Sequence, residues 1–113
     1  MAFYRDGLKH PTHIWEAAAM HHLVRVECGA QRCVNSATFD PHALWGLFYR
    51  RHWDDHFPVA QHRFWCRVCS RLAGFRVKAA QMSSLGTSVG DVTHPLPMPD
   101  EHVWKSFLNR HKG

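Results

Sequence analysis

Apolar residues recur at the three-to-four-residue spacing of an amphipathic helix in three segments of this 113-residue chain. Each segment begins at or just after a residue that caps helices well: Thr12, Asp40 or Asp100. Pro41 strengthens the second of these starts, because proline is favoured at the first position of a helix. The pattern therefore predicts three helices, over residues 12–21, 41–52 and 101–111.

Alternation of apolar and polar residues, which is typical of half-buried strands, follows the first helical segment. Val24 and Val26 alternate with Arg25 and Glu27, so residues 22–27 are predicted to form a strand. Residues 34–39 then return as the second strand of a hairpin. Further strands are predicted at 62–65 and 73–80, where Phe75 and Val77 alternate with basic residues. The combination predicts a small α+β fold.

The composition changes along the chain in a way that suggests four parts. An N-terminal arm and helix, 1–21, of which residues 1–11 are expected to be irregular, precede a core domain, 22–80. A linker rich in serine, glycine and proline follows at 81–99, where alternating prolines favour an extended polyproline conformation. The last part, 100–113, carries the C-terminal helix. Because Trp15 and Trp104 lie on the two terminal helices, we expect both helices to pack on the core. The alternative is that the two tryptophans anchor a partner.

The overall composition limits the class of protein. Hydrophobic residues make up 45% of the chain, which argues against wholesale disorder. No apolar run approaches the ~18 residues of a transmembrane helix, and the N-terminus lacks the apolar stretch of a secretory signal. We therefore expect a cytoplasmic protein with reduced thiols and no membrane partner. A formal net charge of +5 is compatible with a nucleic acid, an acidic protein partner or no specific partner.

Four cysteines carry the clearest chemical signal: Cys28 and Cys33 are spaced C-x4-C, and Cys66 and Cys69 are spaced C-x2-C. Two close pairs of thiolates suit one tetrahedral Zn²⁺, which would stabilise a core domain too small to be stable on its hydrophobic core alone. The alternatives are buried free thiols, a redox pair at the C-x2-C sequence, or a site in which His21 or His22 replaces Cys28.

The paired cysteines, each preceded by a run that resembles a strand, resemble the zinc-ribbon class. Short sequences such as Val-Arg-Val-Glu-Cys and Arg-Phe-Trp-Cys-Arg-Val-Cys are also similar to a small bacterial zinc-ribbon-like protein. The resemblance covers residues 22–80 and implies paired cysteines that hold one zinc. The helix predicted over 41–52 would be inserted between the two pairs of this zinc-ribbon-like core, and the other two predicted helices would flank it. It implies no enzymatic activity, since zinc ribbons serve many roles. The C-x4-C spacing departs from the usual C-x2-C.

The leading functional hypothesis is a non-enzymatic zinc module that binds a nucleic acid or an acidic protein surface, alone or as an accessory subunit; no small-molecule substrate is evident. Basic residues near the cysteines, interleaved with aromatic ones, support it. The alternative is a small metal-dependent hydrolase or nuclease that uses the loop residues His52, Asp54, Asp55 and His56. The predicted contact residues of the leading hypothesis are Arg25, Arg32, Arg63, Arg67, Arg71, Arg76 and Lys78.

Overall fold

A computed structural model describes residues 3–5, 8–30, 33, 35–75, 77–78, 80–87 and 91–111 of the chain. These residues form an α+β fold whose longest dimension is 45 Å. Among them, no helix combines the length and apolar character needed to cross a bilayer. The elements run in the order β1 (Phe3–Arg5), β2 (Leu8–His10), α1 (Ile14–Ala19), β3 (His22–Cys28), β4 (Ser36–Phe39), α2 (Pro41–Arg51), α3 (Phe57–Ala60), the 3-10 turn η1 (Gln61–Arg63), α4 (Arg67–Ala73), β5 (Ala80–Thr87) and α5 (Glu101–His111).

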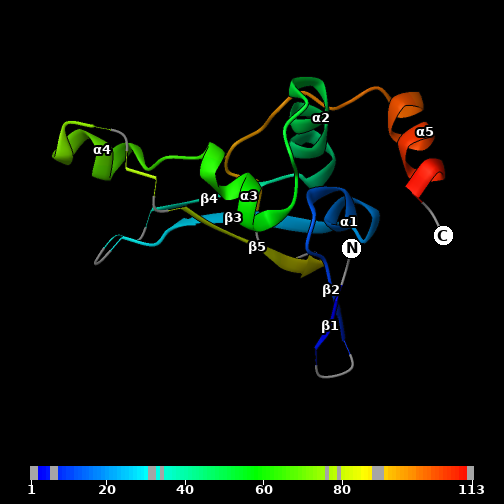
Figure 1. Ribbon diagram of the computed structural model, residues 1–113, viewed down its shortest axis with the longest axis horizontal. Coiled ribbons are helices and arrows are strands. Elements are labelled where there is room, and N and C mark those ends of the chain that lie inside the picture. The colour runs from blue at the N-terminus through cyan, green and yellow to red at the C-terminus, as the bar shows by residue number, and fades with distance from the viewer. Residues whose placement is uncertain are drawn as a thin grey trace.

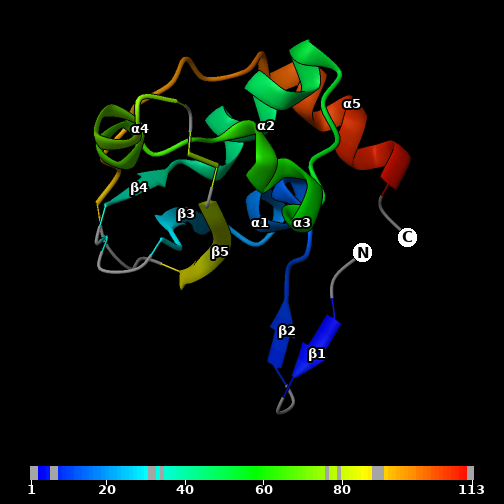
Figure 2. The same ribbon diagram turned by 60° about the vertical axis from the view of Figure 1, so that its left-hand side comes forward.

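A three-stranded antiparallel sheet with the order β4-β3-β5 lies at the centre of the molecule (Figure 1). In β3, Val24 and Val26 are buried whereas Glu27 is exposed, which confirms the predicted alternation. Val26 lies opposite Ala37 of β4 and Met82 of β5. Helices α1, α2 and α3 gather around the end of the sheet where β3 begins, and α4 lies near the end where β3 finishes (Figure 1; Figure 2).

Helix α2 begins where the sequence predicts. Asp40 Oδ1 accepts hydrogen bonds from the backbone N–H groups of His42, at 2.9 Å, and Ala43, at 3.1 Å. The apolar face of this helix supplies the largest side chains of the hydrophobic core. That core consists of Ile14, Ala17, Val24, Val26, Phe39, Leu44, Trp45, Phe48, Phe57, Ala60 and Met82.

Helix α1 is shorter than the predicted helix over 12–21. The Thr12 hydroxyl does not cap it but donates a hydrogen bond to Glu16 Oε1 at 2.9 Å. The carboxylate of Asp55, from the loop between α2 and α3, accepts a hydrogen bond from the backbone N–H of Trp15 at 2.9 Å instead. A residue distant in the sequence therefore satisfies the start of α1, which local sequence cannot reveal.

The C-terminal helix α5 packs on the body of the protein, as expected from its apolar face. The Trp104 ring lies 4.9 Å from the Trp45 ring, and the Phe107 ring lies 5.1 Å from it. Trp15 of α1 also contacts Phe107, at 6.0 Å between ring centroids. Both terminal helices thus enlarge the aromatic core, as the two tryptophans suggested.

The proline-rich segment before α5 crosses α2 closely. A Cβ atom added at Gly46 would lie 2.9 Å from Cβ of Pro99, so the absence of a side chain at Gly46 allows this approach. Leu96 also packs against the core. The second half of the predicted linker over 81–99 is therefore bound to the protein surface rather than free.

The first half of that predicted linker differs more strongly, because β5 occupies 80–87 and pairs with β3 along most of its length. The strand predicted at 73–80 was wrong. Helix α4 extends to Ala73, and Gly74 then reverses the chain at φ 78°, a conformation that glycine adopts without strain. Val77 contributes only an isolated bridge to Cys66.

Two further predictions about local structure were wrong. Residues 62–65 do not form a strand, because the chain turns through α3 and η1 and continues without regular structure to Cys66. A proline in the first turn of α3 favours that helical start. The N-terminal arm, predicted to be irregular, contains the short antiparallel pair β1 and β2, which extends away from the sheet (Figure 2).

Candidate metal centre

The four cysteines come from two places that the fold brings together. Cys28 is the last residue of β3, and Cys33 lies in the loop between β3 and β4. Cys66 is the N-cap residue of α4, and Cys69 lies in its first turn. The second pair therefore lies at the start of a helix, and the strand predicted over 62–65 does not precede it. The paired cysteines are free thiols in the structure.

The backbone N–H groups of all four cysteines donate hydrogen bonds, and that of Cys33 donates to the carbonyl of Ala30 at 3.1 Å. The N–H of Cys28 donates to the carbonyl of Asn35 at 2.9 Å, which closes the loop between β3 and β4. The N–H of Cys66 donates to the carbonyl of Val77 at 3.0 Å and holds the beginning of α4 beside the chain that leaves it. The N–H of Cys69 points to the sulfur of Cys66 at 3.5 Å. These bonds position the side chains before any metal is considered.

The sulfur positions fit one tetrahedral metal ion. All four Sγ atoms lie within 4.8 Å of one another. The Cys28–Cys69 and Cys33–Cys66 sulfur pairs are each separated by 3.7 Å. Four sulfurs placed about 2.3 Å from a central zinc at tetrahedral angles lie about 3.8 Å apart, which matches both pairs. The four thiols could therefore hold a metal ion with little rearrangement.

The electrostatics of the cluster also favour a cation. The hydrogen bond from the Cys69 backbone, followed by one from Asn35 Nδ2 at 3.4 Å, lowers the pKa of Cys66 to about 6. Interaction with Cys33, burial and interaction with Cys28 raise the pKa of Cys69 to about 12. The cluster thus gains its first negative charge easily and its last with difficulty. A divalent ion would remove this repulsion between thiolates.

The two histidines considered as substitute ligands lie outside the sulfur cluster. His22 Nδ1 forms a hydrogen bond with Ser84 Oγ at 2.9 Å, and the His21 ring lies against the ring of His42. Cys28 lies within the cluster, so the irregular C-x4-C spacing does not remove it.

The histidine and aspartate loop, which suggested hydrolase chemistry, has structural contacts instead. Asp54 Oδ1 accepts a hydrogen bond from the N–H of His56 at 2.9 Å, and Asp55 caps α1. The His56 ring stacks on His13 at 4.7 Å, and exposed His52 ends α2 with a φ of 56°. These residues do not form a metal-ligand group within the part of the chain that the structure describes.

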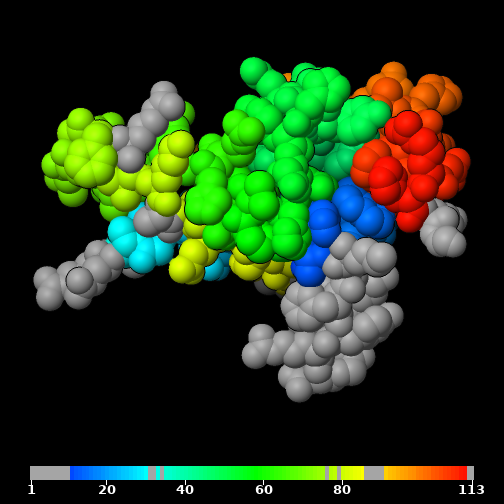
Figure 3. All heavy atoms as spheres, viewed as in Figure 1, coloured from blue at the N-terminus to red at the C-terminus, as the bar shows by residue number. Residues whose placement is uncertain are grey.

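The predicted contact residues that the structure describes come from several different elements. Arg25 lies on the sheet and pairs with Glu27 at 3.7 Å, and the Arg63 guanidinium lies 4.7 Å from the Trp53 ring. Arg67 and Arg71 both lie on α4, which forms a lobe at one end of the molecule (Figure 3). Of the remaining predicted contact residues, Lys78 is exposed, and Arg32 and Arg76 lie outside the described residues.

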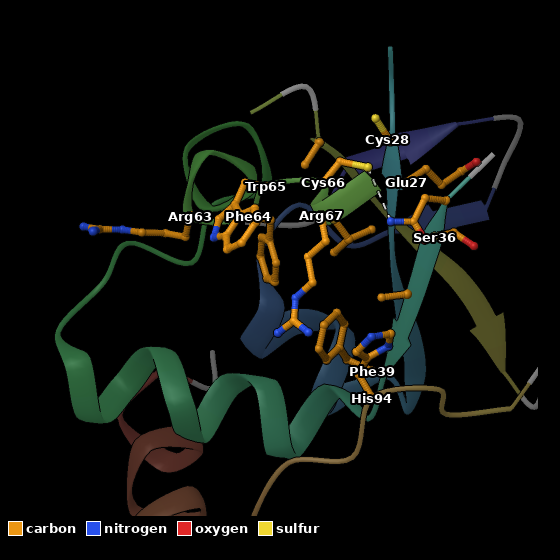
Figure 4. Close-up of a pocket in the computed structure, with 14 residues that line it drawn as sticks. Glu27, Cys28, Ser36, Phe39, Arg63, Phe64, Trp65, Cys66, Arg67 and His94 are labelled. Atoms are coloured by element: carbon orange, nitrogen blue, oxygen red, sulfur yellow. Dashed lines mark hydrogen bonds between the residues drawn. The ribbon is translucent and has the colours of Figure 1, made fainter. Parts of the chain in front are cut away.

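A cavity of about 250 Å³ adjoins the sulfur cluster (Figure 4). Cys28 and Cys66 line one end, and Phe39 and His94 line the other. Arg67 points into the cavity, whereas Arg63, although it lines the rim, points away (Figure 4). Sequence analysis did not identify this site, because no spacing rule connects positions as distant as 39 and 94.

Within the described residues, the cysteine cluster is the one group of three or more side chains with metal-ligand chemistry. Comparison with family models, with curated proteins and with solved structures finds no match. The geometry of the chain's own residues is thus the basis for inferring its function. What that geometry shows is a cluster of four cysteine sulfurs able to hold one metal ion.

Proposed function

We propose that the four cysteines bind one structural Zn²⁺ in a zinc-ribbon-like centre. The observation that carries this proposal is the arrangement of four sulfurs within 4.8 Å of one another. Four thiolates are soft ligands that suit zinc, and they fill its tetrahedral shell. No position then remains for the bound water that a catalytic zinc requires. The chemistry of the site is therefore structural.

The fold gives this zinc a clear structural task. Helix α4 has seven residues, and only Ser70 among them is buried. A helix this short is unstable alone, so its attachments decide whether it forms. Besides the sulfurs, the attachments include the Cys66–Val77 bridge and a hydrogen bond from the Val77 N–H to Ser70 Oγ at 2.8 Å. Zinc would join α4 to the end of β3 and contribute folding free energy of order 10 kcal/mol.

The zinc-stapled lobe serves, in this proposal, as a non-enzymatic module for binding a macromolecule. Residues 56–90 contain no aspartate or glutamate, but they contain four arginines and one lysine. Apolar side chains are also exposed there: Val68 at 52%, Leu72 at 85% and Phe75 at 69%. Such a surface suits an anionic partner. No contact of the His52–His56 loop favours the hydrolase alternative.

Native mass spectrometry of the purified protein tests the zinc proposal. We expect one zinc ion per chain under native conditions, its loss on denaturation, and four reactive thiols appearing at the same time. A folded protein with four free thiols and no metal would contradict the structural-zinc proposal. A second, exchangeable metal ion would instead favour the hydrolase alternative.

A further inference from the structure

The cavity beside the metal centre is lined by planar rings from three separate segments. Phe39 ends β4, Phe64 and Trp65 precede α4, and His94 lies in the segment that leads to α5. The Phe39 ring centroid lies 5.7 Å from that of Phe64 and 5.7 Å from that of His94. A planar ring of a ligand can stack against walls of this kind.

An arginine guanidinium lies inside the cavity. Arg67 reaches into the cavity (Figure 4), and no carboxylate in the described part of the chain lies within ion-pair distance of it. Glu27, the one acidic residue of the lining, is half-exposed and pairs with Arg25. A guanidinium without a carboxylate partner is suited to a phosphate, which it can bind through two hydrogen bonds.

The size of the cavity limits the ligand. About 250 Å³ is slightly below the usual volume of a small-molecule site, so it accommodates one ring with its attached groups. A second hollow of about 460 Å³ adjoins it along α4, and Trp65 and Arg67 line both. Arg71 and exposed Phe75 line this second hollow as well. Each of the two hollows is therefore lined by both aromatic rings and an arginine. Such a succession suits a polymer in which planar rings and anionic groups recur.

We propose that this cavity binds one nucleotide of a single-stranded nucleic acid, with its base among the rings and its phosphate at Arg67. The neighbouring part of the strand follows α4 toward Arg71 and Phe75. The proposal rests on the proposed function, since Cys28 and Cys66 form part of the wall. Bases stacked in a duplex cannot enter between side-chain rings, so the site requires single strands. The aliphatic residues Val68 and Leu72 do not line either hollow and take no part.

Fluorescence anisotropy with a labelled single-stranded oligonucleotide of about ten residues tests the proposal on the zinc-loaded protein. Trp65→Leu keeps an apolar side chain but removes the ring, and we expect affinity to fall by about 5-fold to 100-fold. Arg67→Gln removes the phosphate contact and should reduce the slope of log affinity against log salt by about 0.7. Arg50→Gln, on the exposed end of α2, removes the same charge outside the cavity and should change affinity by less than about 2-fold.

Several outcomes would overturn the proposal. Equal loss of affinity in Arg67→Gln and Arg50→Gln would indicate attraction by net charge rather than a site. Equal affinity for duplex and single strand would also contradict it. If a free mononucleotide bound as tightly as the oligonucleotide, the ligand would be a single nucleotide, and the proposed contact of a strand with α4 would be wrong. Binding of an acidic peptide that is lost in Leu72→Ala, without oligonucleotide binding, would assign the lobe to a protein partner.

Zinc content, measured on every variant, separates this proposal from the one on which it rests. A zinc-loaded, folded protein that does not bind single strands overturns the nucleic-acid site and leaves the structural zinc intact. A protein without zinc overturns the structural-zinc proposal and, with it, a cavity whose wall includes two of the ligands.

Discussion

Replacement of Cys66 by serine is expected to abolish zinc binding and to unfold α4. Cys66 is the N-cap of α4, and its sulfur lies 3.7 Å from that of Cys33. Serine is itself a good N-cap residue, so the substitution preserves the helix start and specifically removes a metal ligand. Zinc binding free energy of order 10 kcal/mol is lost with the fourth thiolate. The expected result is zero zinc by mass spectrometry and rapid tryptic cleavage after Arg67 and Arg71.

The position of the hydrophobic core decides how far this unfolding spreads. The buried core residues Val26 and Met82 lie opposite one another, two residues before Cys28 along β3. Most of the core lies farther from the sulfurs, around α1 and α2. We therefore expect residues 64–75 to lose structure first, while the core keeps a cooperative transition at a lower temperature.

Val68→Ser is the matched control, because Val68 lies on the same helix but is exposed and is not a candidate ligand. It should keep its zinc and its resistance to trypsin. Cys28→Ser should behave like Cys66→Ser despite the irregular spacing of Cys28 and Cys33. A Cys66→Ser protein that retains zinc with wild-type affinity would contradict the four-cysteine centre.

Replacement of Trp45 by alanine is expected to destabilise the whole fold by about 3–5 kcal/mol. Only 2% of the Trp45 surface is exposed, and its ring contacts those of Tyr49, Trp104 and Phe107 at centroid distances of 4.8 to 5.1 Å. The truncation leaves a cavity at the point where α5 joins α2. Since small proteins are typically stable by about 5–15 kcal/mol, the loss is a large fraction of the total.

Thermal denaturation followed by far-ultraviolet circular dichroism measures this effect, with an expected decrease in Tm of about 10 °C or more. Trp104→Ala provides the comparison: this half-buried residue lies on α5, so its truncation should release α5 with a smaller decrease in Tm. Both variants should still bind one zinc, because the aromatic contacts lie apart from the sulfurs. A Tm of Trp45→Ala within about 2 °C of wild type would contradict the central position of Trp45 in the core.

Local signals were sufficient for several elements of the fold. Asp40 and Pro41 fixed the start of α2 because capping depends on a few neighbouring residues. The alternation around Val24 and Val26 identified β3, whose faces differ in burial. The cysteine spacings identified four residues that the fold does bring together, because this chemistry requires close sulfurs.

Other features depend on contacts between distant segments, which sequence periodicity does not contain. Strand β5 contains two serines and a glycine, and its backbone pairing with β3 determines its conformation. The C-x2-C spacing of Cys66 and Cys69 suits the first turn of a helix as well as a turn between strands, and the structure has the helix. The cavity joins Phe39 and His94, which approach only after the C-terminal segment has packed.

X-ray absorption at the zinc edge tests the central claim most directly, because it identifies the atoms bound to the metal. The four-cysteine centre predicts four sulfur neighbours about 2.3 Å from the zinc and no lighter ligand. One or more nitrogen or oxygen neighbours at about 2.0–2.1 Å would show that a histidine or water completes the shell, and would contradict the closed structural site proposed for this protein.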